Sequence, residues 1–394
     1  MEKVGQAFYL LDASKLQTNY DEFYTALSRH YKKVQIAYSY KTNFTPYLCR
    51  ALNRYGAWAE IVSEMELDMA IKNGVQSNRI IFNGPVKTRQ AIHRCLHLGI
   101  VLQIDNLTEW SIIEQWVTTN VEKLISVALR INYNSQENAP SRFGLSLVNG
   151  DFSQVIERIK LYKTVALTGL HIHYIDQFRT TDSFVAKLHK LINVMAAIQG
   201  FKPKYLNIGG GFFSEMTEGL KKQFELSIPS LTQYGEALSF AMKGQFADDG
   251  PILLVEPGAA LVANTTTFVC CIWEIKKGLK QNYAFCTGSK YNIKPTLHNR
   301  QVDYYRVGED GADLHNNLCV SGYTCQEEDV LIENYNGKLT KGDFLIFENL
   351  GAYVQVLKPP FIEPDFPVLA VEEDFKTRLI RRKQTYDDIL GSYL

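Results

Sequence analysis

The stretch VQIAYSYKTNFTPYLCRALNRYG, residues 34–56, decides the fold. Its first part is mostly apolar and aromatic, as in a buried strand, and its second part has the spacing of an amphipathic helix that ends at Gly56. Lys41 stands between the two predicted elements, directly after the strand. A strand that leads through a short connection into a helix is half of a βαβ unit, so this stretch predicts parallel strand pairing.

The same strand–helix pair recurs over the first two-thirds of the chain. About eight strands of this kind favour a closed (β/α)8 barrel of the TIM type, in the α/β class, over an open sheet. The strand candidates are residues 34–40, 57–63, 79–84, 101–106, 125–132, 167–175, 205–211 and 252–258.

From about residue 261 the pattern changes to strands with turn signals and almost no helical period, which predicts an all-β domain. The opening AFYLLDAS, residues 7–14, is also strand-like, and we expect it to join this domain. The predicted boundaries are therefore 25–260 for the barrel, and 1–24 with 261–394 for the β domain. We expect the charged last segment, residues 375–394, to be a surface helix.

Composition excludes several classes of protein. The 42 basic and 42 acidic side chains cancel, so bulk charge does not recruit nucleic acid or an anionic membrane. No apolar run is long enough for a membrane span, and the N-terminal residues lack the pattern of a signal peptide. The seven cysteines are odd in number and scattered without a CxxC motif, so we expect no metal site, no disulfide framework and a cytoplasmic location.

Several chemically capable residues end predicted barrel strands, where active sites of such barrels lie. They are Lys41, the pair His171 and His173, the triplet Gly209 to Gly211, and Glu256. Taken singly, a lysine at a strand end is usually solvated, and a glycine triplet is often only a turn. Their joint placement at the strand ends favours a shared site.

Together these residues suit one cofactor. A lysine in a partly desolvated, aromatic-lined site can form a Schiff base with an aldehyde. Backbone N–H groups of a glycine triplet can approach a phosphate closely. A carboxylate can keep a pyridine nitrogen protonated, an imidazole can lie against the ring, and the charged ring then accepts electrons from a carbanion. This combination predicts pyridoxal 5′-phosphate (PLP).

At this point the chain resembles the fold-type III PLP-dependent decarboxylases, which join an alanine-racemase-type barrel to a β domain in the ornithine and diaminopimelate decarboxylase branch. In the barrel, the matching segments are YSYKTN, GLHIHYIDQ, LNIGGGF and EPGAALVAN. In the β domain they are YTCQEEDVL and GDFLIFENLGAYV. The segments stand in the family's order and cover nearly the whole chain.

The resemblance implies roles for individual residues. Lys41 would bind the cofactor covalently and act with Cys325, which would protonate the carbanion after CO₂ leaves. The cofactor-binding set would be Lys41, Glu60, His173, Gly209, Gly210, Gly211, Glu256 and Tyr353. In the family the cysteine comes from the partner subunit, so a homodimer with shared active sites is implied.

Two family positions near the phosphate differ in this chain. The arginine that follows the family's E-P-G is Ala259, and the family's G-S pair is replaced by Ile175 and Asp176. Two favourable anion contacts are lost and a carboxylate is added. Arg179 could compensate.

The residues expected to bind the far end of the substrate differ as well. Lys294 and His298 stand where the diaminopimelate enzymes have an arginine and a tyrosine, and a lysine lacks the planar fork of an arginine. Gln326 replaces the acid after the cysteine. The sequence therefore predicts PLP-dependent decarboxylation of a non-standard or conjugated amino-acid substrate in a specialised pathway, such as aminopropyl formation of the microcin C type.

Other functions stay open from the sequence. One is decarboxylation of free diaminopimelate or ornithine, and another is a regulatory relative that has lost PLP. An amino-acid racemase on the same fold would need a tyrosine from the β domain as its second base, whereas the cysteine motif favours a decarboxylase. The small PLP-binding homeostasis proteins have only the barrel.

Overall fold

The computed structural model describes residues 5–132, 141–175, 178–247, 249–372 and 375–393. The chain divides into two compact units. The barrel unit comprises residues 19–213 and 228–260, and the β unit comprises residues 1–18, 214–227 and 261–394. The segment 214–227 thus groups with the β unit although the barrel unit flanks it in sequence. The sequence-based domain boundaries, 25–260 and 1–24 with 261–394, stay a prediction, because compact units do not test which parts fold separately.

Eight parallel strands close into a barrel, which confirms the predicted fold class. Each strand pairs with the next along the chain, and Leu253 pairs with Val34 to close the ring. The strands are β2 (Val34–Ser39), β3 (Trp58–Ile61), β4 (Ile80–Phe82), β5 (Val101–Ile104), β6 (Ile125–Ile131), β7 (Val165–Ile172), β8 (Tyr205–Asn207) and β9 (Ile252–Val255).

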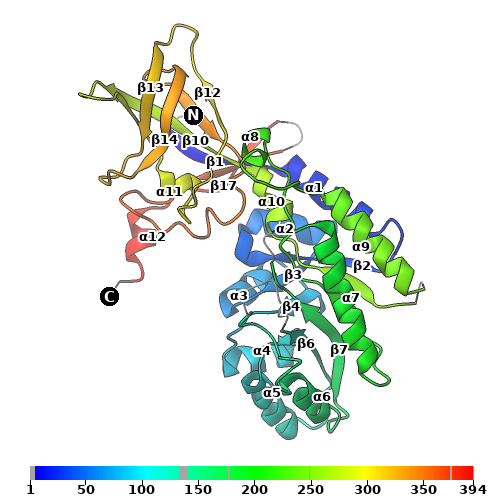
Figure 1. Cartoon of the computed structure of the whole chain (residues 1–394). Coiled ribbons are helices and arrows are strands. Elements are labelled where there is room, and N and C mark those ends of the chain that lie inside the picture. Colours follow the sequence, from blue (N-terminus) through cyan, green and yellow to red (C-terminus); the bar gives the residue numbers. More distant parts are fainter. Residues whose placement is uncertain (1–4, 133–140, 176–177, 248, 373–374, 394) are drawn as a thin grey trace. The chain divides into compact units, whose positions relative to one another are not determined.

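Helices connect the barrel strands. Helix α2 begins at Pro46 and ends at Tyr55, and the next residue, Gly56, adopts the left-handed φ of 108° that glycine tolerates best. The longer helices are α1 (Ala13–Leu27), α2 (Pro46–Tyr55), α3 (Glu64–Lys72), α4 (Arg89–Leu98), α5 (Leu107–Thr119), α6 (Asp151–Ile159), α7 (Thr181–Ala197) and α9 (Leu231–Gln245). Figure 1 shows α4, α5, α6 and α7 on the outside of the strands.

The remaining helical pieces are short. They are α8 (Glu218–Lys221), α10 (Ala259–Val262), α11 (Lys290–Ile293), α12 (Tyr386–Leu390) and the 3₁₀ turns Tyr40–Thr42, Ser77–Arg79 and Ala263–Thr265.

An apolar cluster packs inside the barrel, below the C-terminal ends of its strands. Its five buried members come from five different strands: Ala37, Ile81, Ala128, Tyr205 and Leu254. Side chains two residues apart on a strand point to the same side, so the next inward-facing position on each strand lies one layer closer to the C-terminal end. That position is polar on all five strands: Ser39, Asn83, Arg130, Asn207 and Glu256.

The β unit is built on a nine-stranded sheet. Its strands are β1 (Ala7–Asp12), β10 (Thr266–Lys276), β11 (Tyr283–Cys286), β12 (Tyr304–Val307), β13 (Leu314–Ser321), β14 (Val330–Lys338), β15 (Phe344–Phe347), β16 (Val368–Val371) and β17 (Thr377–Arg381). Strand β1 lies in the middle, antiparallel to β10 and parallel to β16. Strand β15 pairs with both β10 and β12.

The helix predicted for residues 375–394 is wrong in its first half. Residues 377–381 form β17, which pairs antiparallel with β16, and only Tyr386–Leu390 is helical. The edge of β16 offers hydrogen-bond partners that an isolated helix would not use, and Thr377 and Ile380 are β-branched residues that suit a strand. The charged composition of the segment gives no strand pattern of its own.

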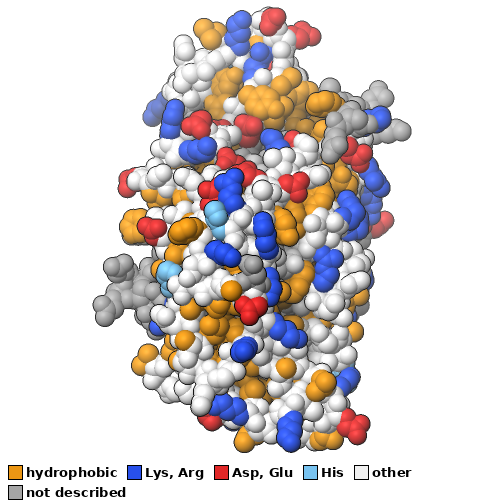
Figure 2. All heavy atoms as spheres, turned by 90° about the vertical axis from the view of Figure 1, so that its right-hand side faces the viewer, with side chains coloured by type: hydrophobic (Ala, Val, Ile, Leu, Met, Phe, Trp, Pro, Cys, Tyr) orange, Lys and Arg blue, Asp and Glu red, His pale blue; other side chains and the backbone are white. Residues whose placement is uncertain are grey.

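Charged side chains of both signs are spread over the surface. On the face drawn in Figure 2, basic and acidic side chains are interspersed, in line with equal numbers of the two in the sequence. Within the part of the chain that the structure describes, no helix is both long enough and apolar enough to cross a membrane.

Candidate active site

Eight buried polar side chains, one from each barrel strand, gather at the C-terminal ends of the strands. We call them the strand-end layer: Ser39, Glu60, Asn83, Gln103, Arg130, His171, Asn207 and Glu256. The sequence singled out Glu60, His171 and Glu256 but missed the other five, Ser39, Asn83, Gln103, Arg130 and Asn207. A signal existed, because each missed residue is the polar member at the end of an apolar run.

Lys41 and Glu60 form an ion pair at one side of this layer. Lys41 lies in the 3₁₀ turn that follows β2, and its Nζ donates to Oε2 of Glu60, which is completely buried. The Lys41 side chain is 37% exposed, so the amine is anchored on a buried carboxylate but reaches the open end of the barrel. Ser39 Oγ lies 3.4 Å from the same nitrogen.

The aromatic lining expected around Lys41 stays a prediction, although the two tyrosines nearest to it in sequence pack against α2. Tyr38 and Tyr40 are buried, with Tyr38 donating to the Asn43 carbonyl at 2.8 Å. Both tyrosines line a small pocket together with Cys49 and Leu52 of α2, so they pack behind the strand. Two groups beside the lysine nitrogen, Glu60 Oε2 and Ser39 Oγ, are polar.

Glu256 lies at the end of β9 among hydrogen-bond donors. Its Oε1 accepts from Asn207 Nδ2 at 2.6 Å, Asn83 Nδ2 at 3.1 Å and Gln103 Nε2 at 3.3 Å. His171 Nε2 lies 3.5 Å from Oε2. Burial raises the pKa of Glu256, while the charge of Lys41 and the hydrogen bond from Asn207 act in the opposite direction.

The glycine triplet holds the ring of His173. The Gly210 N–H donates to His173 Nδ1 at 2.9 Å, and a Cβ on Gly209 would lie 2.4 Å from the same atom. Burial, followed by the charge of Arg130, lowers the pKa of His173 well below its ordinary value, so the imidazole is neutral. The Gly209 N–H is also used within the protein, donating to Asn207 Oδ1 at 2.9 Å. Two of the three backbone N–H groups that were expected to bind phosphate, those of Gly209 and Gly210, therefore already donate to acceptors within the protein.

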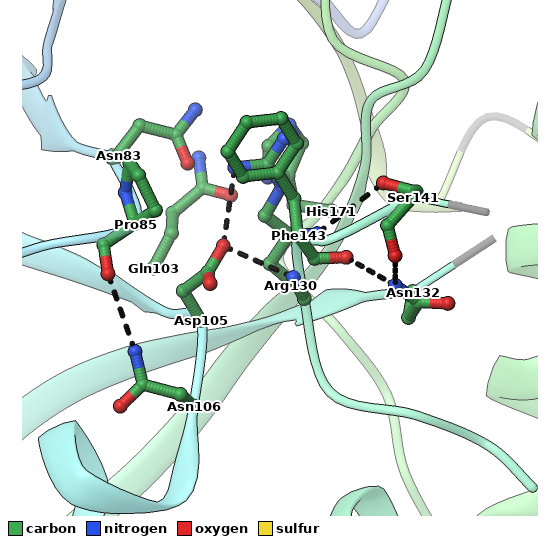
Figure 3. A network of polar contacts seen from close by, with 12 residues as sticks. Asn83, Pro85, Gln103, Asp105, Asn106, Arg130, Asn132, Ser141, Phe143 and His171 are labelled. Carbon is green, nitrogen blue, oxygen red and sulfur yellow. Dashed lines mark hydrogen bonds and ion pairs between the residues drawn. The ribbon is translucent and has the colours of Figure 1, made fainter. Parts of the chain in front are cut away.

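A buried ion pair joins the ends of β5 and β6 (Figure 3). Arg130 Nη1 donates to Asp105 Oδ1 at 3.1 Å, and the same oxygen accepts from the Gly144 N–H at 3.1 Å. The guanidinium carbon lies 4.7 Å from the centre of the Phe143 ring. Asp105 thus ties the segment after residue 140 to the end of the barrel, beside Gln103 and His171.

The β unit carries the predicted Cys325 on a braced turn. Cys325 is exposed, whereas the other six cysteines are buried. The buried Asp329 holds the turn: its Oδ2 accepts from the Thr324 N–H at 3.1 Å, and its Oδ1 accepts from Ser289 Oγ at 2.9 Å. Gln326 accepts a hydrogen bond from the Tyr291 hydroxyl at 2.5 Å.

Lys294 and His298 lie near each other in the β unit. Burial lowers the pKa of Lys294, and burial together with the charges of Lys294 and Arg300 lowers the pKa of His298. The segment 294–300 thus carries three basic side chains, and the acid Glu333 acts on the pKa of Lys294 in the opposite direction to burial. Tyr353 is 40% exposed and has a left-handed φ of 57°.

The altered phosphate positions are only partly visible. Ala259 opens the short helix α10 and brings no charge, and Asp176 lies outside the described residues. Arg179 stacks on Phe213 with its guanidinium carbon 4.8 Å from the ring centre. The buried Lys187 of α7 places its Nζ 4.6 Å from the Tyr174 ring centre and 3.9 Å from that of Phe184.

The residues present fit the predicted cofactor. A Cβ on Gly210 would lie 2.1 Å from the Glu256 carbonyl oxygen, so this close approach of backbone requires glycine. A primary amine, a neutral imidazole and a buried carboxylate are the groups that such a ring needs. His171, His173 and Glu256 also bring possible metal-ligand atoms within 4.8 Å of one another. The Gly210 N–H already donates to His173, however, and the side-chain amides of Asn83, Gln103 and Asn207 already donate to Glu256.

The β unit contains a cavity of its own. It measures about 780 Å³ and its wall includes Trp273, Phe285, Tyr323 and Phe366. Two of its charged wall residues pair with each other, Lys383 Nζ lying 3.2 Å from Glu363 Oε2. Its wall also includes the buried thiol of Cys286, and its size alone does not make it a site.

Comparisons with known proteins agree with this geometry. A family model described as "Pyridoxal-dependent decarboxylase, pyridoxal binding domain" matches residues 14–263. Diaminopimelate decarboxylase of Bacillus subtilis (strain 168) is 26% identical, covering 99% of this chain and 91% of the relative. The enzyme of that name from Archaeoglobus fulgidus is 25% identical, covering 99% and 93%. A crystal structure of diaminopimelate decarboxylase from M. jannaschii superposes with a TM-score of 0.88 at 22% identity, covering 100% of this chain and 93% of that chain.

Proposed function

Because the chain belongs to the family of pyridoxal-dependent decarboxylases, we propose that it removes the α-carboxylate from an amino-acid group whose far end is negatively charged. The chain is an enzyme of the carboxy-lyase class, and its cofactor is PLP. What supports the proposal for the substrate is the segment between α11 and β12, which carries three basic side chains, Lys294, His298 and Arg300. Gln326 adds no charge with which to bind a distal amine.

The barrel unit supplies the groups that hold the cofactor. When bound, PLP supplies an electron sink for the electron pair left by the departing CO₂. Lys41 would hold it covalently, and Glu60 is the acceptor placed to take the proton that the lysine must lose to act as a nucleophile. The neutral ring of His173 can pack on the cofactor without adding charge, and Glu256 would pair with the ring nitrogen.

The phosphate end needs positive charge that Ala259 cannot supply. Arg179 and Lys187 are the cations beside the glycine segment: Arg179 stacks on Phe213, and Lys187 contacts Phe184, whose ring stacks on Phe212 at 4.1 Å. We therefore assign both to the phosphate side, with the backbone of Gly211 and the hydroxyl of Tyr353 as further contacts.

The β unit would complete the reaction. An exposed thiol on a braced turn is suited to protonate the carbanion, and this is the role assigned to Cys325. By analogy with the family, this turn would come from the second subunit of a homodimer with shared active sites. All seven cysteines are free, which suits the cytoplasmic location expected from the sequence.

Two kinds of substrate satisfy the proposed charge pattern. A conjugated amino acid, such as a 3-amino-3-carboxypropyl phosphodiester that would give an aminopropyl group, has its negative charge at the far end and no distal amine. Free diaminopimelate is the second candidate, since relatives named for that activity match 99% of this chain. It carries a distal amine as well, for which Gln326 offers no carboxylate.

A panel of substrates tests this proposal. CO₂ release would be measured with meso-diaminopimelate, L-ornithine and a 3-amino-3-carboxypropyl phosphodiester, using the PLP-loaded chain. The proposal predicts a kcat/KM at least about tenfold higher for the phosphodiester, the value of one charge-assisted contact. Lys294→Ala should raise KM for that substrate, and the exposed Lys341→Ala serves as control. Preferred turnover of free diaminopimelate would favour the second candidate, and preferred turnover of ornithine would refute both.

A further inference from the structure

Three primary amides surround the buried Glu256 carboxylate. Asn207 donates at 2.6 Å, Asn83 at 3.1 Å to each oxygen, and Gln103 at 3.3 Å. The three residues come from the ends of β8, β4 and β5, and all are at least 95% buried. A buried carboxylate is costly unless donors satisfy its oxygens, so this is a built environment for one negative charge.

The donors are neutral, and that is the informative feature. An arginine or lysine in contact with Glu256 would neutralise the carboxylate within the protein. The buried Arg130 is instead committed to Asp105 at 3.1 Å, and His171 is uncharged because it is fully buried. Amides stabilise the charge without cancelling it, so the carboxylate keeps its attraction for a cationic ligand atom.

Asn207 has a second contact that the other two amides lack. Its Oδ1 accepts from the Gly209 N–H at 2.9 Å, while the Glu256 N–H donates to the Gly209 carbonyl at 2.9 Å. Gly210, the next residue, fixes the ring of His173 through a 2.9 Å hydrogen bond. One side chain thus connects the carboxylate to the segment that holds the imidazole.

We infer that Asn207 is a positioning residue that, with Gln103 and Asn83, holds Glu256 charged and aimed at the cofactor's ring nitrogen and couples this carboxylate to the glycine segment. The inference rests on the proposed role of Glu256. On this inference, the side-chain amides of Asn83, Gln103 and Asn207 determine how strongly the site prefers a ring with a protonated nitrogen. They act through Glu256, as positioning residues.

The test compares two ligands that differ at one atom. PLP has the ring nitrogen, and 1-deaza-PLP has a C–H in its place, so only PLP can pair with Glu256. Dissociation constants would be measured by equilibrium dialysis on the full-length chain, without substrate. The readout is the ratio of the two constants, PLP over 1-deaza-PLP, which a general loosening of the fold leaves unchanged because it weakens both ligands alike.

We expect Asn207→Leu to weaken both ligands, through the freed glycine segment, and to raise the ratio about tenfold, through the lost charge-assisted hydrogen bond. Gln103→Met keeps the glycine contact and should raise the ratio severalfold with little change for 1-deaza-PLP. Gln35→Met is the matched control, because this barrel glutamine donates to the carbonyls of Ile36 and Gly56 instead. Its ratio should stay at the wild-type value.

The outcomes separate two failures. If Glu256→Gln raises the ratio but neither Asn207→Leu nor Gln103→Met does, the positioning role of the amides is refuted and the role of Glu256 stands. If Glu256→Gln leaves the ratio unchanged, the proposed partner of the ring nitrogen is itself wrong. Should Asn207→Leu fold poorly, Gln103→Met still decides whether the amides position Glu256, and Asn207→Asp, which keeps an acceptor for the Gly209 N–H but removes the amide donor, separates that role from the glycine contact.

Discussion

At the scale of single residues, the proposed reaction depends on an amine and a thiol with different surroundings. Lys41 is paired with a fully buried carboxylate, and Cys325 is exposed on a turn held by Asp329. The Lys41 amine is therefore held in place by Glu60 before any ligand binds, whereas the Cys325 thiol is accessible to reagents in solution. This difference can be measured chemically.

Alkylation should find Cys325 first. The other six cysteines are buried, so iodoacetamide should modify Cys325 fastest and abolish CO₂ release without displacing PLP. Cys325→Ala should keep the bound cofactor and slow turnover by about 100-fold or more, the usual size of a lost general acid. Peptide mapping beside the activity assay checks this, with Cys319→Ala as the buried control. A fully alkylated chain with undiminished turnover would remove the assignment.

The sequence predicts the reactive residues better than the residues that support them. Lys41, His173 and Glu256 stand in recognisable segments. Asn207 and Gln103 are chemically bland, and they gain meaning only because each lies two positions beyond an apolar residue that faces the barrel interior. A single strand does not reveal which of its two faces points inward, so closure of the barrel is needed to bring these residues together.

At the scale of elements, the ends of β5 and β6 are joined by the pair of Asp105 and Arg130. Both side chains are at most 8% exposed. Asp105→Ala should cost about 3–5 kcal/mol of unfolding free energy, because it leaves Arg130 buried without its anion. The double variant with Arg130→Met should recover part of that loss. Urea unfolding of the four chains checks this, and additive losses would contradict the coupling.

The first turn of α3 gives a pH-dependent prediction. Burial raises the pKa of Glu66 to about 7 from 4.5. A raised folded-state pKa stabilises the fold below about pH 4.5, and this contribution is lost as the pH rises through 7. Glu66→Gln should therefore match wild type near pH 4.5 and be more stable at pH 8, by on the order of 3 kcal/mol. Urea unfolding at both values tests this, and Glu122→Gln, at an exposed site, should show no such change. A wild type more stable than the variant at pH 8 would contradict it.

Whether a segment is a helix or a strand can be predicted where its sequence pattern is strong. The prediction fails where pairing with a neighbouring strand determines the structure. Residues 46–55 form α2 because Pro46 and Gly56 delimit an amphipathic stretch. Residues 377–381 form β17 because the edge of β16 is available to pair with them. The sequence of residues 377–381 alone does not show that β16 lies beside them in the folded chain.

At the scale of the whole molecule, the proposed residues divide between two units. Lys41, Glu60, His173 and Glu256 belong to the barrel unit, and Cys325 and Lys294 belong to the β unit. The comparisons cover both units, since the relatives match 99% of the chain. If sites are shared between subunits, as in the family, each site takes its barrel residues and its cysteine from different chains.

Mixing two inactive variants tests the shared sites. Lys41→Ala and Cys325→Ala chains, unfolded together in equal amounts and refolded with PLP, should regain roughly a quarter of the wild-type activity. Random pairing makes half of the dimers mixed, and each mixed dimer has one intact site. Each variant refolded alone is the control. Sedimentation should show a dimer, and a monomer or an inactive mixture would refute the shared-site proposal.

The central claim is that the end of the barrel holds PLP on Lys41. The most direct measurement is borohydride reduction of the PLP-loaded chain, followed by peptide mass spectrometry. We expect one reduced pyridoxyl phosphate per chain, on the peptide that contains Lys41, and none after Lys41→Ala. A stable adduct on another lysine, or no adduct on a chain that releases CO₂, would contradict it.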